Sequence, residues 1–197
     1  MFHFINKFSR KLLFLNSLFW KYNKKKLKSV KLVVFDVDGV LTDGSLWISK
    51  SGEIFKNFNV KDGLGIHLLQ EKGIEIAFIS GGLSGSTEFR AKQLNIKYCY
   101  VGVKDKSQKI KEIQKLTGFN KNQTVFLGDD LNDLVVKQNV SLLIVPCNAS
   151  TGIRKKADII LTKKGGDGAV REFVDKLLTN DPYYRRINRE GWVKTNI

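Results

Sequence analysis

Short apolar runs alternate with amphipathic, helix-like stretches along most of the chain. The runs are rich in Val, Ile, Leu and Phe and stop at glycine or polar residues, as buried parallel strands do. Strands are predicted at residues 31–35, 74–80, 96–100, 124–127, 142–145 and 159–161. Helices are predicted at residues 62–72, 84–94, 105–116 and 169–178. This alternation indicates an α/β fold with a doubly wound, mostly parallel, Rossmann-like sheet.

A β-hairpin is expected soon after the first strand. Segments 46–49 and 53–58 flank Lys50-Ser51-Gly52, where the glycine supplies a tight turn. The hairpin carries more apolar side chains than two isolated strands can bury, namely Leu46, Trp47, Ile48, Ile54, Phe55 and Phe58. We therefore expect it to contact another subunit. Asp62 is expected to cap the helix that follows.

The first 29 residues form a basic, apolar arm. Residues 1–30 hold eight of the 34 Lys and Arg residues and no acid, which accounts for much of the formal charge of +15. The apolar stretch of the arm is too short to span a bilayer, and no signal-peptide cleavage site follows it. Residues 1–28 are interpreted either as a helix on an anionic lipid surface or as a solvated or subunit-contacting extension. Residues 30–178 then form the main domain, and residues 179–197 form a C-terminal tail.

Two cysteines, Cys99 and Cys147, lie in apolar segments far apart in the sequence. No CxxC or Cys/His spacing accompanies them. We interpret both as reduced core residues of a cytoplasmic protein.

Polar side chains stand where predicted strands end. They are Asp36 and Asp38 after the first strand, Ser80 after the second, Asp129, Asp130 and Asp133 after residues 124–127, and Lys106 at the start of a helix. Because parallel strands end at one edge of a sheet, these side chains are expected to converge there. Carboxylates suit Mg²⁺, and a nucleophile, a metal and phosphate donors are what phosphoryl transfer to a carboxylate needs.

Four motifs, in this order, resemble the signatures of the haloacid dehalogenase superfamily of phosphatases. They are DVDGVLTDG from Asp36, Ser80-Gly81, Lys106, and GDDLND from Gly128. FNVKDGLGI (58–66) and GGDGAVRE (165–172) further resemble the capless branch that contains 3-deoxy-D-manno-octulosonate 8-phosphate phosphatases and related nonulosonate 9-phosphate phosphatases. The resemblance covers roughly residues 30–178. It implies a fold without a large cap domain, a Mg²⁺-dependent phosphatase for sugar or sugar-acid phosphates, a place in lipopolysaccharide biosynthesis, and a homotetramer.

The resemblance also implies catalytic roles. Asp36 would be the nucleophile that forms an aspartyl-phosphate. Asp38 would protonate the leaving alkoxide and then activate water. Ser80 would hydrogen-bond the phosphoryl oxygens, and Lys106 would counter the charge of the nucleophile and the phosphate.

Metal and substrate ligands follow from the same resemblance. The metal ligands would be Asp36, the backbone carbonyl of Asp38, and Asp129, supported by Asp130 and by Asp133, which would orient Lys106 or a metal-bound water. The substrate-binding set would be Asp38, Asn59, Val60, Lys61, Asp62, Gly63, His67, Gly81, Gly82, Arg90 and Lys106.

Two positions depart from the pattern of the octulosonate phosphatases. Those enzymes usually have an arginine where this chain has Gly82 and another where it has His67. An arginine grips a carboxylate through two hydrogen bonds, whereas glycine and neutral histidine do not. Lys61 and Arg90 remain as cationic candidates. The catalytic set is therefore intact, while recognition of a substrate carboxylate is expected to differ.

Other classes of protein explain less. Taken singly, Ser80, Lys106 and Asp130 would be ordinary capping or solvated residues. A dinucleotide-binding domain would need GxGxxG after the first strand, which this chain lacks. A nucleic-acid-binding protein would explain the charge, but the basic residues concentrate in the arm. The alternative that we keep is a receiver-like phospho-aspartate signalling or binding domain, or a catalytically lapsed scaffold.

Overall fold

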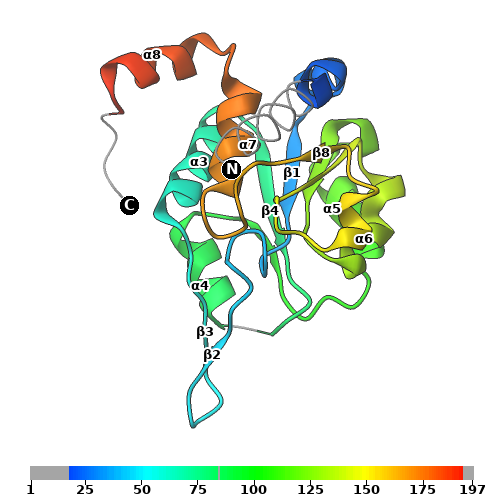
Figure 1. Ribbon diagram of the computed structural model, residues 1–197, viewed down its shortest axis with the longest axis vertical. Helices are drawn as coiled ribbons and strands as arrows, with labels where there is room; N and C mark the ends of the chain where they lie inside the picture. The colour runs from blue at the N-terminus through cyan, green and yellow to red at the C-terminus, as the bar shows by residue number, and fades with distance from the viewer. Residues whose placement is uncertain (1–17, 84, 193–197) are drawn as a thin grey trace, which may run out of the picture.

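A six-stranded parallel sheet in the order β5-β4-β1-β6-β7-β8 forms the centre of the structure (Figure 1). The structure is a computed structural model that describes residues 18–83 and 85–192. The strands are β1 Leu32–Phe35, β4 Glu75–Ile79, β5 Tyr98–Tyr100, β6 Thr124–Leu127, β7 Leu142–Val145 and β8 Ile159–Ile160. The predicted doubly wound parallel sheet is confirmed.

Helices cover both faces of this sheet. In Figure 1, α3 and α7 lie on one side of the strands, and α5 and α6 lie on the other. The α-helices are α2 Lys24–Lys28, α3 Val60–Glu71, α4 Gly85–Gln93, α5 Lys106–Thr117, α6 Thr151–Arg154, α7 Ala169–Leu178 and α8 Pro182–Glu190. Two 3₁₀-helices, η1 Lys121–Gln123 and η2 Leu131–Asn139, lie before and after β6. The described chain contains no large cap domain.

The central strand β1 separates two hydrophobic cores. Val33 and Phe35 belong to the core under α3 and α7, whereas Leu32 and Val34 belong to the core under α5 and η2. All four side chains are fully buried. Because successive residues of a strand point to opposite faces, both cores specify the register of β1. The position of the residues directly after β1 is fixed with it.

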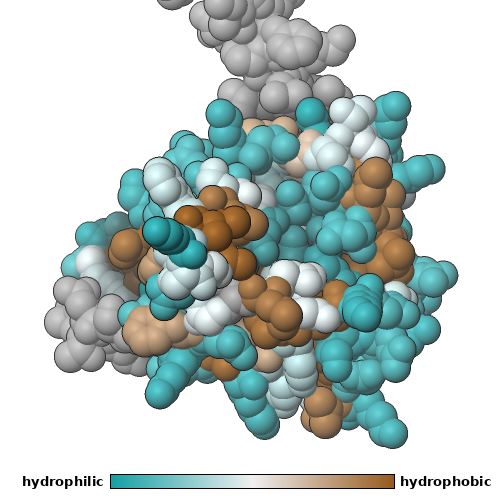
Figure 2. Space-filling view, turned by 90° about the horizontal axis from the view of Figure 1, so that it is seen from below, coloured by the Kyte–Doolittle hydropathy of each residue, from teal (hydrophilic) through white to brown (hydrophobic). Residues whose placement is uncertain are grey.

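The predicted hairpin projects from one end of the molecule (Figure 1). Strands β2 (Trp47–Ile48) and β3 (Ile54–Phe55) pair in antiparallel fashion. Gly52 turns the chain between them with a φ of +85°, a conformation that favours glycine. Figure 2, which views the molecule from this end, shows hydrophobic side chains among hydrophilic ones. The exposed large apolar residues of the hairpin are Leu46, Trp47, Ile48 and Phe55.

Helix α3 begins before Asp62, so the expectation that Asp62 caps it is wrong. The cap is Asn59, whose side-chain oxygen accepts the backbone N–H of Lys61 at 2.8 Å. Asp62 lies inside the helix, is 1% exposed, and accepts the backbone N–H of Arg171 in α7 at 2.7 Å. Burial raises the pKa of Asp62 to about 6. This carboxyl therefore caps the neighbouring helix, a contact that only the packing of α3 on α7 creates.

The tail after residue 178 contains a helix that the hydrophobic pattern did not predict. Helix α8 begins with Pro182, and the side chain of Asp181 accepts the N–H of Tyr184 at 3.0 Å. Both are recognised start signals for a helix. They were overlooked because the residues that follow are mostly polar.

The described part of the arm packs on the domain. The ring of Trp20 lies 6.3 Å from that of Phe173 in α7, and Leu27 also contacts this core. Residues 1–17, which carry most of the predicted amphipathic pattern, lie outside the described residues, so contact with lipid stays a prediction. Within residues 18–83 and 85–192, no helix combines the length and the hydrophobicity that crossing a bilayer requires.

Both cysteines are unpaired and partly buried. Cys99 lies in β5 and contacts the core under α3 and α7. Burial raises the pKa of its thiol to about 11, so the thiol is neutral at ordinary pH. The cytoplasmic location inferred from the cysteines stays a prediction.

Candidate active site

Residues after β1, β4 and β6 meet at the carboxyl edge of the sheet. Asp36 directly follows β1, Ser80 directly follows β4, and Asp129 lies two residues after β6. These strands are neighbours, because β1 pairs with β4 on one side and with β6 on the other. Asp36 is 4% exposed and Ser80 is fully buried. The fold thus brings the predicted strand-end residues to one place, as the topology of a parallel sheet requires.

Lys106 links two of the aspartates. It is the first residue of α5, and Asp105 caps this helix by accepting the N–H of Gln108 at 2.9 Å. The Nζ atom of Lys106 lies 2.8 Å from Oδ1 of Asp36 and 2.6 Å from Oδ1 of Asp133. The lysine is 3% exposed and Asp133 is fully buried. Such a buried ion pair is stable only when each partner is present.

Asp133 and Asp130 support the loop that carries Asp129. Oδ2 of Asp133 accepts the N–H of Asp129 at 2.9 Å. Asp130 forms a capping box with Asp133 at the start of η2, and its Oδ1 accepts the N–H of Leu131 at 2.7 Å. Asp130 is exposed, so the structure places it as a helix cap at the rim of the cluster.

Asp36, Asp129 and Asp133 share one lysine. Burial raises the pKa of Asp36 well above its usual value, Asp133 raises it further, and Lys106 opposes both. Burial and the charge of Asp133 also raise the pKa of Asp129 to about 6. Burial lowers the pKa of Lys106, but Asp36 and Asp133 outweigh it and leave that pKa above its usual value. The cluster therefore has an excess of negative charge that a cation would relieve.

A divalent metal ion fits this cluster. One carboxylate oxygen from each of Asp36, Asp129 and Asp133 lies within 4.8 Å of the others. Lys106 and the N–H of Asp129 each bond one oxygen of Asp133, which leaves this carboxylate less able to bind a metal than Asp36 and Asp129. A Cβ atom at Gly39 would lie 2.0 Å from Oδ2 of Asp129. Glycine at this turn is therefore needed for Asp129 to reach the cluster.

Asp38 faces a different set of neighbours. Its Oδ2 accepts the hydroxyl of Ser80 at 3.2 Å, and a Cβ atom at Gly82 would lie 3.6 Å from the same oxygen. The ammonium of Lys56 lies 2.8 Å from Oδ1 and 2.9 Å from Oδ2. We did not predict Lys56 from the sequence. It lies on the return side of the hairpin among apolar residues, and only the fold of the hairpin turns its side chain toward Asp38.

The glycine-rich loop after β8 lies against the turn that follows β1. The N–H of Gly166 donates to the carbonyl of Val40 at 3.0 Å, and Asn59 donates from its amide to the carbonyl of Gly166 at 3.2 Å. A Cβ atom at Gly165 would lie 1.8 Å from the carbonyl oxygen of Gly39. The loop can approach this closely only because it has no side chain there. Asn59 thus has a structural contact beside the candidate site.

The predicted cationic substrate ligands lie in different cavities. Lys61 is exposed and lines a cavity of about 540 Å³ together with Arg171. Arg90 lines another cavity, of about 430 Å³, together with Lys56. His67 shares a cavity of about 200 Å³ with Arg90, and burial lowers its pKa. Arg90 and His67 therefore line one cavity, and Lys61 lines another.

The remaining predicted substrate residues differ widely in exposure. Gly81 and Gly82 are exposed next to Ser80. Val60 is 81% exposed. Gly63 is buried under Arg90, whose guanidinium nitrogen would lie 2.3 Å from a Cβ atom at this position. Asp62, described above, is also buried, whereas Gly63 lines the cavity that Arg90 and His67 share.

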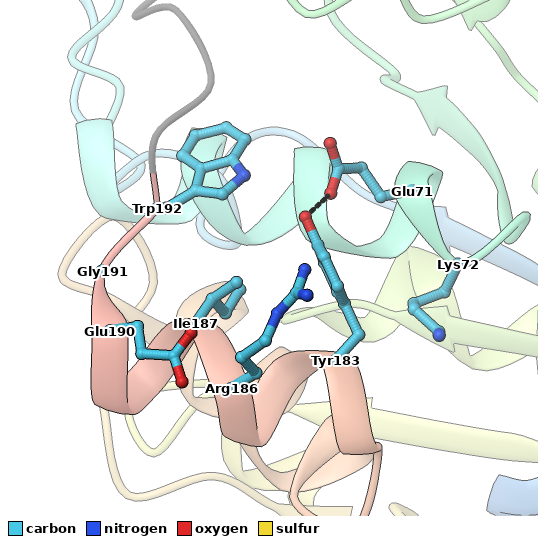
Figure 3. A pocket seen from close by; sticks show the side chains of 8 residues that line it. All are labelled: Glu71, Lys72, Tyr183, Arg186, Ile187, Glu190, Gly191 and Trp192. Atoms are coloured by element: carbon cyan, nitrogen blue, oxygen red, sulfur yellow. Dashed lines mark hydrogen bonds between the residues drawn. The ribbon is translucent and has the colours of Figure 1, made fainter.

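A cleft of about 680 Å³ lies elsewhere, between the end of α3 and α8 (Figure 3). Figure 3 shows Arg186, Ile187 and Trp192 around it, and the hydroxyl of Tyr183 donates to Glu71 at 2.5 Å. None of the strand-end residues lines this cleft. The convergent polar groups, rather than the volume of a cavity, therefore locate the candidate active site.

Known proteins resemble this chain in sequence and in fold. Residues 102–173 match the haloacid dehalogenase-like hydrolase family. The chain is 36% identical over 155 residues to 3-deoxy-D-manno-octulosonate 8-phosphate phosphatase KdsC of Haemophilus influenzae, covering 79% of this chain and 86% of that protein.

Two solved structures add detail about metals. The 3-deoxy-D-manno-octulosonate 8-phosphate phosphatase of Moraxella catarrhalis, in complex with a magnesium ion, a phosphate ion and KDO, is 34% identical with a TM-score of 0.81, and covers 86% of this chain and 99% of its own. The cobalt-bound deoxy-D-mannose-octulosonate 8-phosphate phosphatase (YrbI) of Haemophilus influenzae has the same identity, coverage and TM-score, at 34%, 86%, 99% and 0.81. Both proteins thus bind a divalent metal.

We expect Mg²⁺ to stabilise the folded protein through Asp129. A metal present at a hundred times its Kd adds about 2.7 kcal/mol to the free energy of unfolding. Asp129→Asn should remove most of the Mg²⁺-dependent rise in Tm, measured by calorimetry with Mg²⁺ and with EDTA. Asp130→Asn is the matched control, because Asp130 is exposed and asparagine also caps helices. An unchanged Mg²⁺-dependent rise in Asp129→Asn would contradict the assignment.

Proposed function

Because the chain belongs to the haloacid dehalogenase-like hydrolases, in the group of the 3-deoxy-D-manno-octulosonate 8-phosphate phosphatases, and is a phosphatase, we propose that it hydrolyses a phosphorylated sugar acid through an aspartyl-phosphate. The substrate class is 3-deoxy-D-manno-octulosonate 8-phosphate or a related nonulosonate 9-phosphate. The observation that carries the mechanism is the position of Asp36, buried at the end of β1 and paired with Lys106 at 2.8 Å. The alternative of a lapsed or receiver-like domain is not kept, because the relatives are phosphatases.

The first half of the reaction forms the covalent intermediate. A carboxylate oxygen of Asp36 attacks the phosphorus, and the bond from phosphorus to the sugar oxygen breaks. Asp38 gives a proton to that oxygen, because an unprotonated alkoxide leaves slowly. Lys106 holds Asp36 in place, and the hydroxyl of Ser80, which donates to Asp38 in this structure, would turn to donate to a phosphoryl oxygen.

The second half returns the enzyme to its starting state. Asp38, now a carboxylate, takes a proton from a water molecule as that water attacks the phosphorus. The bond between phosphorus and Asp36 breaks, and inorganic phosphate leaves. Two carboxylates with different neighbours can divide these roles, since Asp36 pairs with Lys106 and Asp38 contacts Ser80 and Lys56.

Mg²⁺ would be held by Asp36, Asp129 and the backbone carbonyl of Asp38. The bound ion would neutralise the charge of the phosphoryl oxygens. The excess of carboxylates over lysines in the cluster and the closeness of the carboxylate oxygens of Asp36 and Asp129 support this proposal. Asp133 would act by holding Lys106 and the N–H of Asp129.

Replacing each of the two catalytic carboxylates by an amide tests the mechanism. Asp36→Asn should remove turnover, because the amide cannot form an aspartyl-phosphate. Asp38→Asn should also be inactive in steady state, but with ³²P-labelled p-nitrophenyl phosphate, whose leaving group needs no proton, it should retain label on the protein after an acid quench. The measurement is phosphate release with and without Mg²⁺, together with the trapped label. Substantial Mg²⁺-dependent turnover by Asp36→Asn would contradict the mechanism.

Substrate selectivity is proposed to differ from that of the octulosonate phosphatases that it resembles. Gly82 offers no side chain next to Asp38, and His67 lies in a cavity where burial keeps it neutral. A charge-assisted hydrogen bond contributes about 1.5–3 kcal/mol, so loss of one weakens discrimination for a carboxylate by roughly ten- to a hundredfold. We therefore propose weaker selectivity for octulosonate 8-phosphate, or a preference for another phosphorylated sugar.

Gly82→Arg is expected to raise the preference for an acidic over a neutral sugar phosphate by about tenfold or more. The position is exposed, and its nearest neighbours leave ordinary contact distances for a Cβ atom. The measurement is the ratio of kcat/KM for octulosonate 8-phosphate to that for a neutral sugar phosphate. Gly82→Gln controls for size without charge. A wild type that already strongly prefers octulosonate 8-phosphate, with no change in Gly82→Arg, would show this proposal to be wrong.

We further propose that the enzyme is a homotetramer held together at the hairpin. Trp47 and Ile48 are 68% and 66% exposed, which is costly for a monomer. Light scattering at micromolar concentration should give the mass of four chains, and Trp47→Ser should lower it. Leu116→Ser is the control, because Leu116 is also an exposed apolar residue but lies on α5. An active monomer would refute the proposal.

A further inference from the structure

We propose that Lys56 is a positioning residue for Asp38 and that it couples the proton-transfer carboxyl to the hairpin. The inference rests on the proposed function, in which Asp38 protonates the leaving alkoxide. Lys56 directly follows β3 and is separated from Asp38 in the sequence by both strands of the hairpin. Its role follows from three contacts of its ammonium group.

The ammonium of Lys56 has polar partners on Asp38 and on Thr87. It lies 2.8 Å and 2.9 Å from the two oxygens of Asp38, and it donates to the hydroxyl of Thr87 at 3.2 Å. The Lys56 side chain is 2% exposed, whereas that of Asp38 is 32% exposed. The lysine therefore lies behind the carboxyl, and the carboxyl keeps a face open to a substrate. Burying a lysine this fully is costly unless its charge is paired, so the contact with Asp38 is a strong constraint.

Each of the two reacting carboxyls has its own lysine. Lys106, from α5, pairs with Asp36, and Lys56, from the hairpin, pairs with Asp38. The two lysines belong to different elements, and each contacts a different one of the two carboxyls. Asp36 must point at phosphorus and Asp38 at the leaving oxygen, so separate anchors can hold the two carboxyls at different angles.

Thr87 gives the ammonium a second acceptor. When one oxygen of Asp38 turns to deliver its proton to the leaving alkoxide, Lys56 can keep its bonds to the other oxygen and to Thr87. Thr87 is fully buried in α4, so it is a fixed point. The ammonium thus keeps hydrogen-bond acceptors while Asp38 carries its proton, and it forms the ion pair again once Asp38 has become a carboxylate.

The same contacts attach the hairpin to α4. Ser86 donates from its hydroxyl to the carbonyl of Ile54 in β3 at 2.7 Å, and the adjacent Thr87 accepts from Lys56. Two consecutive residues of α4 therefore hold the return strand of the hairpin. A rotation of the hairpin at this point would carry Lys56, and with it the carboxyl of Asp38.

Leaving groups of different quality test the role of Lys56. p-Nitrophenolate leaves without a proton, whereas the alkoxide of β-glycerol phosphate needs one. The ratio of kcat/KM for the two substrates reports only steps up to phosphoryl transfer, so hydrolysis of the intermediate does not affect it. Lys56→Met should lower kcat/KM for β-glycerol phosphate by about 10²-fold, within the usual range for a general acid, and should change the value for p-nitrophenyl phosphate less than about threefold.

Two further variants complete the experiment. Lys56→Arg keeps the charge but cannot place a planar group equally on all three acceptors, so it should show a smaller loss for β-glycerol phosphate alone. It also provides the comparison if Lys56→Met does not fold, as judged by its melting curve. Lys50→Met, at an exposed lysine of the hairpin turn, should leave both values unchanged.

The possible results distinguish a failure of the proposed role of Lys56 from a failure of the proposed function. Equal losses for both substrates in the folded Lys56 variants, or no loss for either, would overturn the role of Lys56. A wild-type protein inactive on both esters, or an active Asp36→Asn variant, would instead overturn the proposed function. A loss confined to β-glycerol phosphate supports Lys56 as the residue that positions Asp38.

Discussion

The ion pairs of Lys106 hold together the side chains on which the rest of the site depends. Asp36 and Asp133 approach the same ammonium from β1 and η2, and all three groups are almost entirely buried. Removing one member of such a set leaves an uncompensated buried charge, which costs about 3–5 kcal/mol. Asp133 also accepts the N–H of Asp129, so the position of Asp129, the other candidate metal ligand, depends on the same lysine. Charge balance within the cluster thus determines the geometry of the strand ends.

The backbone around this cluster is positioned by close approaches that only glycine permits. Gly39 allows Asp129 to reach Asp36, and Gly165 allows the loop before α7 to lie on the carbonyl of Gly39. Asp62 then fixes the start of α7 from within α3. The turn after β1 is therefore fixed by contacts with the loop after β6 and with the loop before α7, and α7 is in turn fixed by α3. A site that must keep two carboxyls at different angles needs this rigidity in its backbone.

The sequence predicts the features that depend on local order. The apolar run before Asp36 predicts a buried strand. Because this run ends directly before Asp36, both Asp36 and Asp38 are expected at the edge of the sheet where the strand ends. The helix that Lys106 opens was predicted for similar reasons. Asp62 was misplaced because both Asn59 and Asp62 are good caps, and only the packing of α3 against α7 decides between them. Lys56 could not be predicted, because its contact with Asp38 depends on how the hairpin folds back on α4.

The hairpin carries both an exposed apolar surface and the lysine that contacts Asp38, and it is too short to be stable alone. Strands β2 and β3 are two residues long each, and isolated two-stranded hairpins are marginal in water. Its return strand β3 is held by Ser86 and by the contacts of Lys56 with Asp38 and Thr87, whereas β2 exposes Trp47 and Ile48, which pair with Phe55 and Ile54 of β3. Whatever covers β2 therefore also limits the motion of β3, with which it pairs, and of Lys56 directly after it. The exposed apolar side chains of β2 and the contact of Lys56 with Asp38 thus belong to one short element, so a partner bound to the hairpin would also restrict the carboxyl of Asp38.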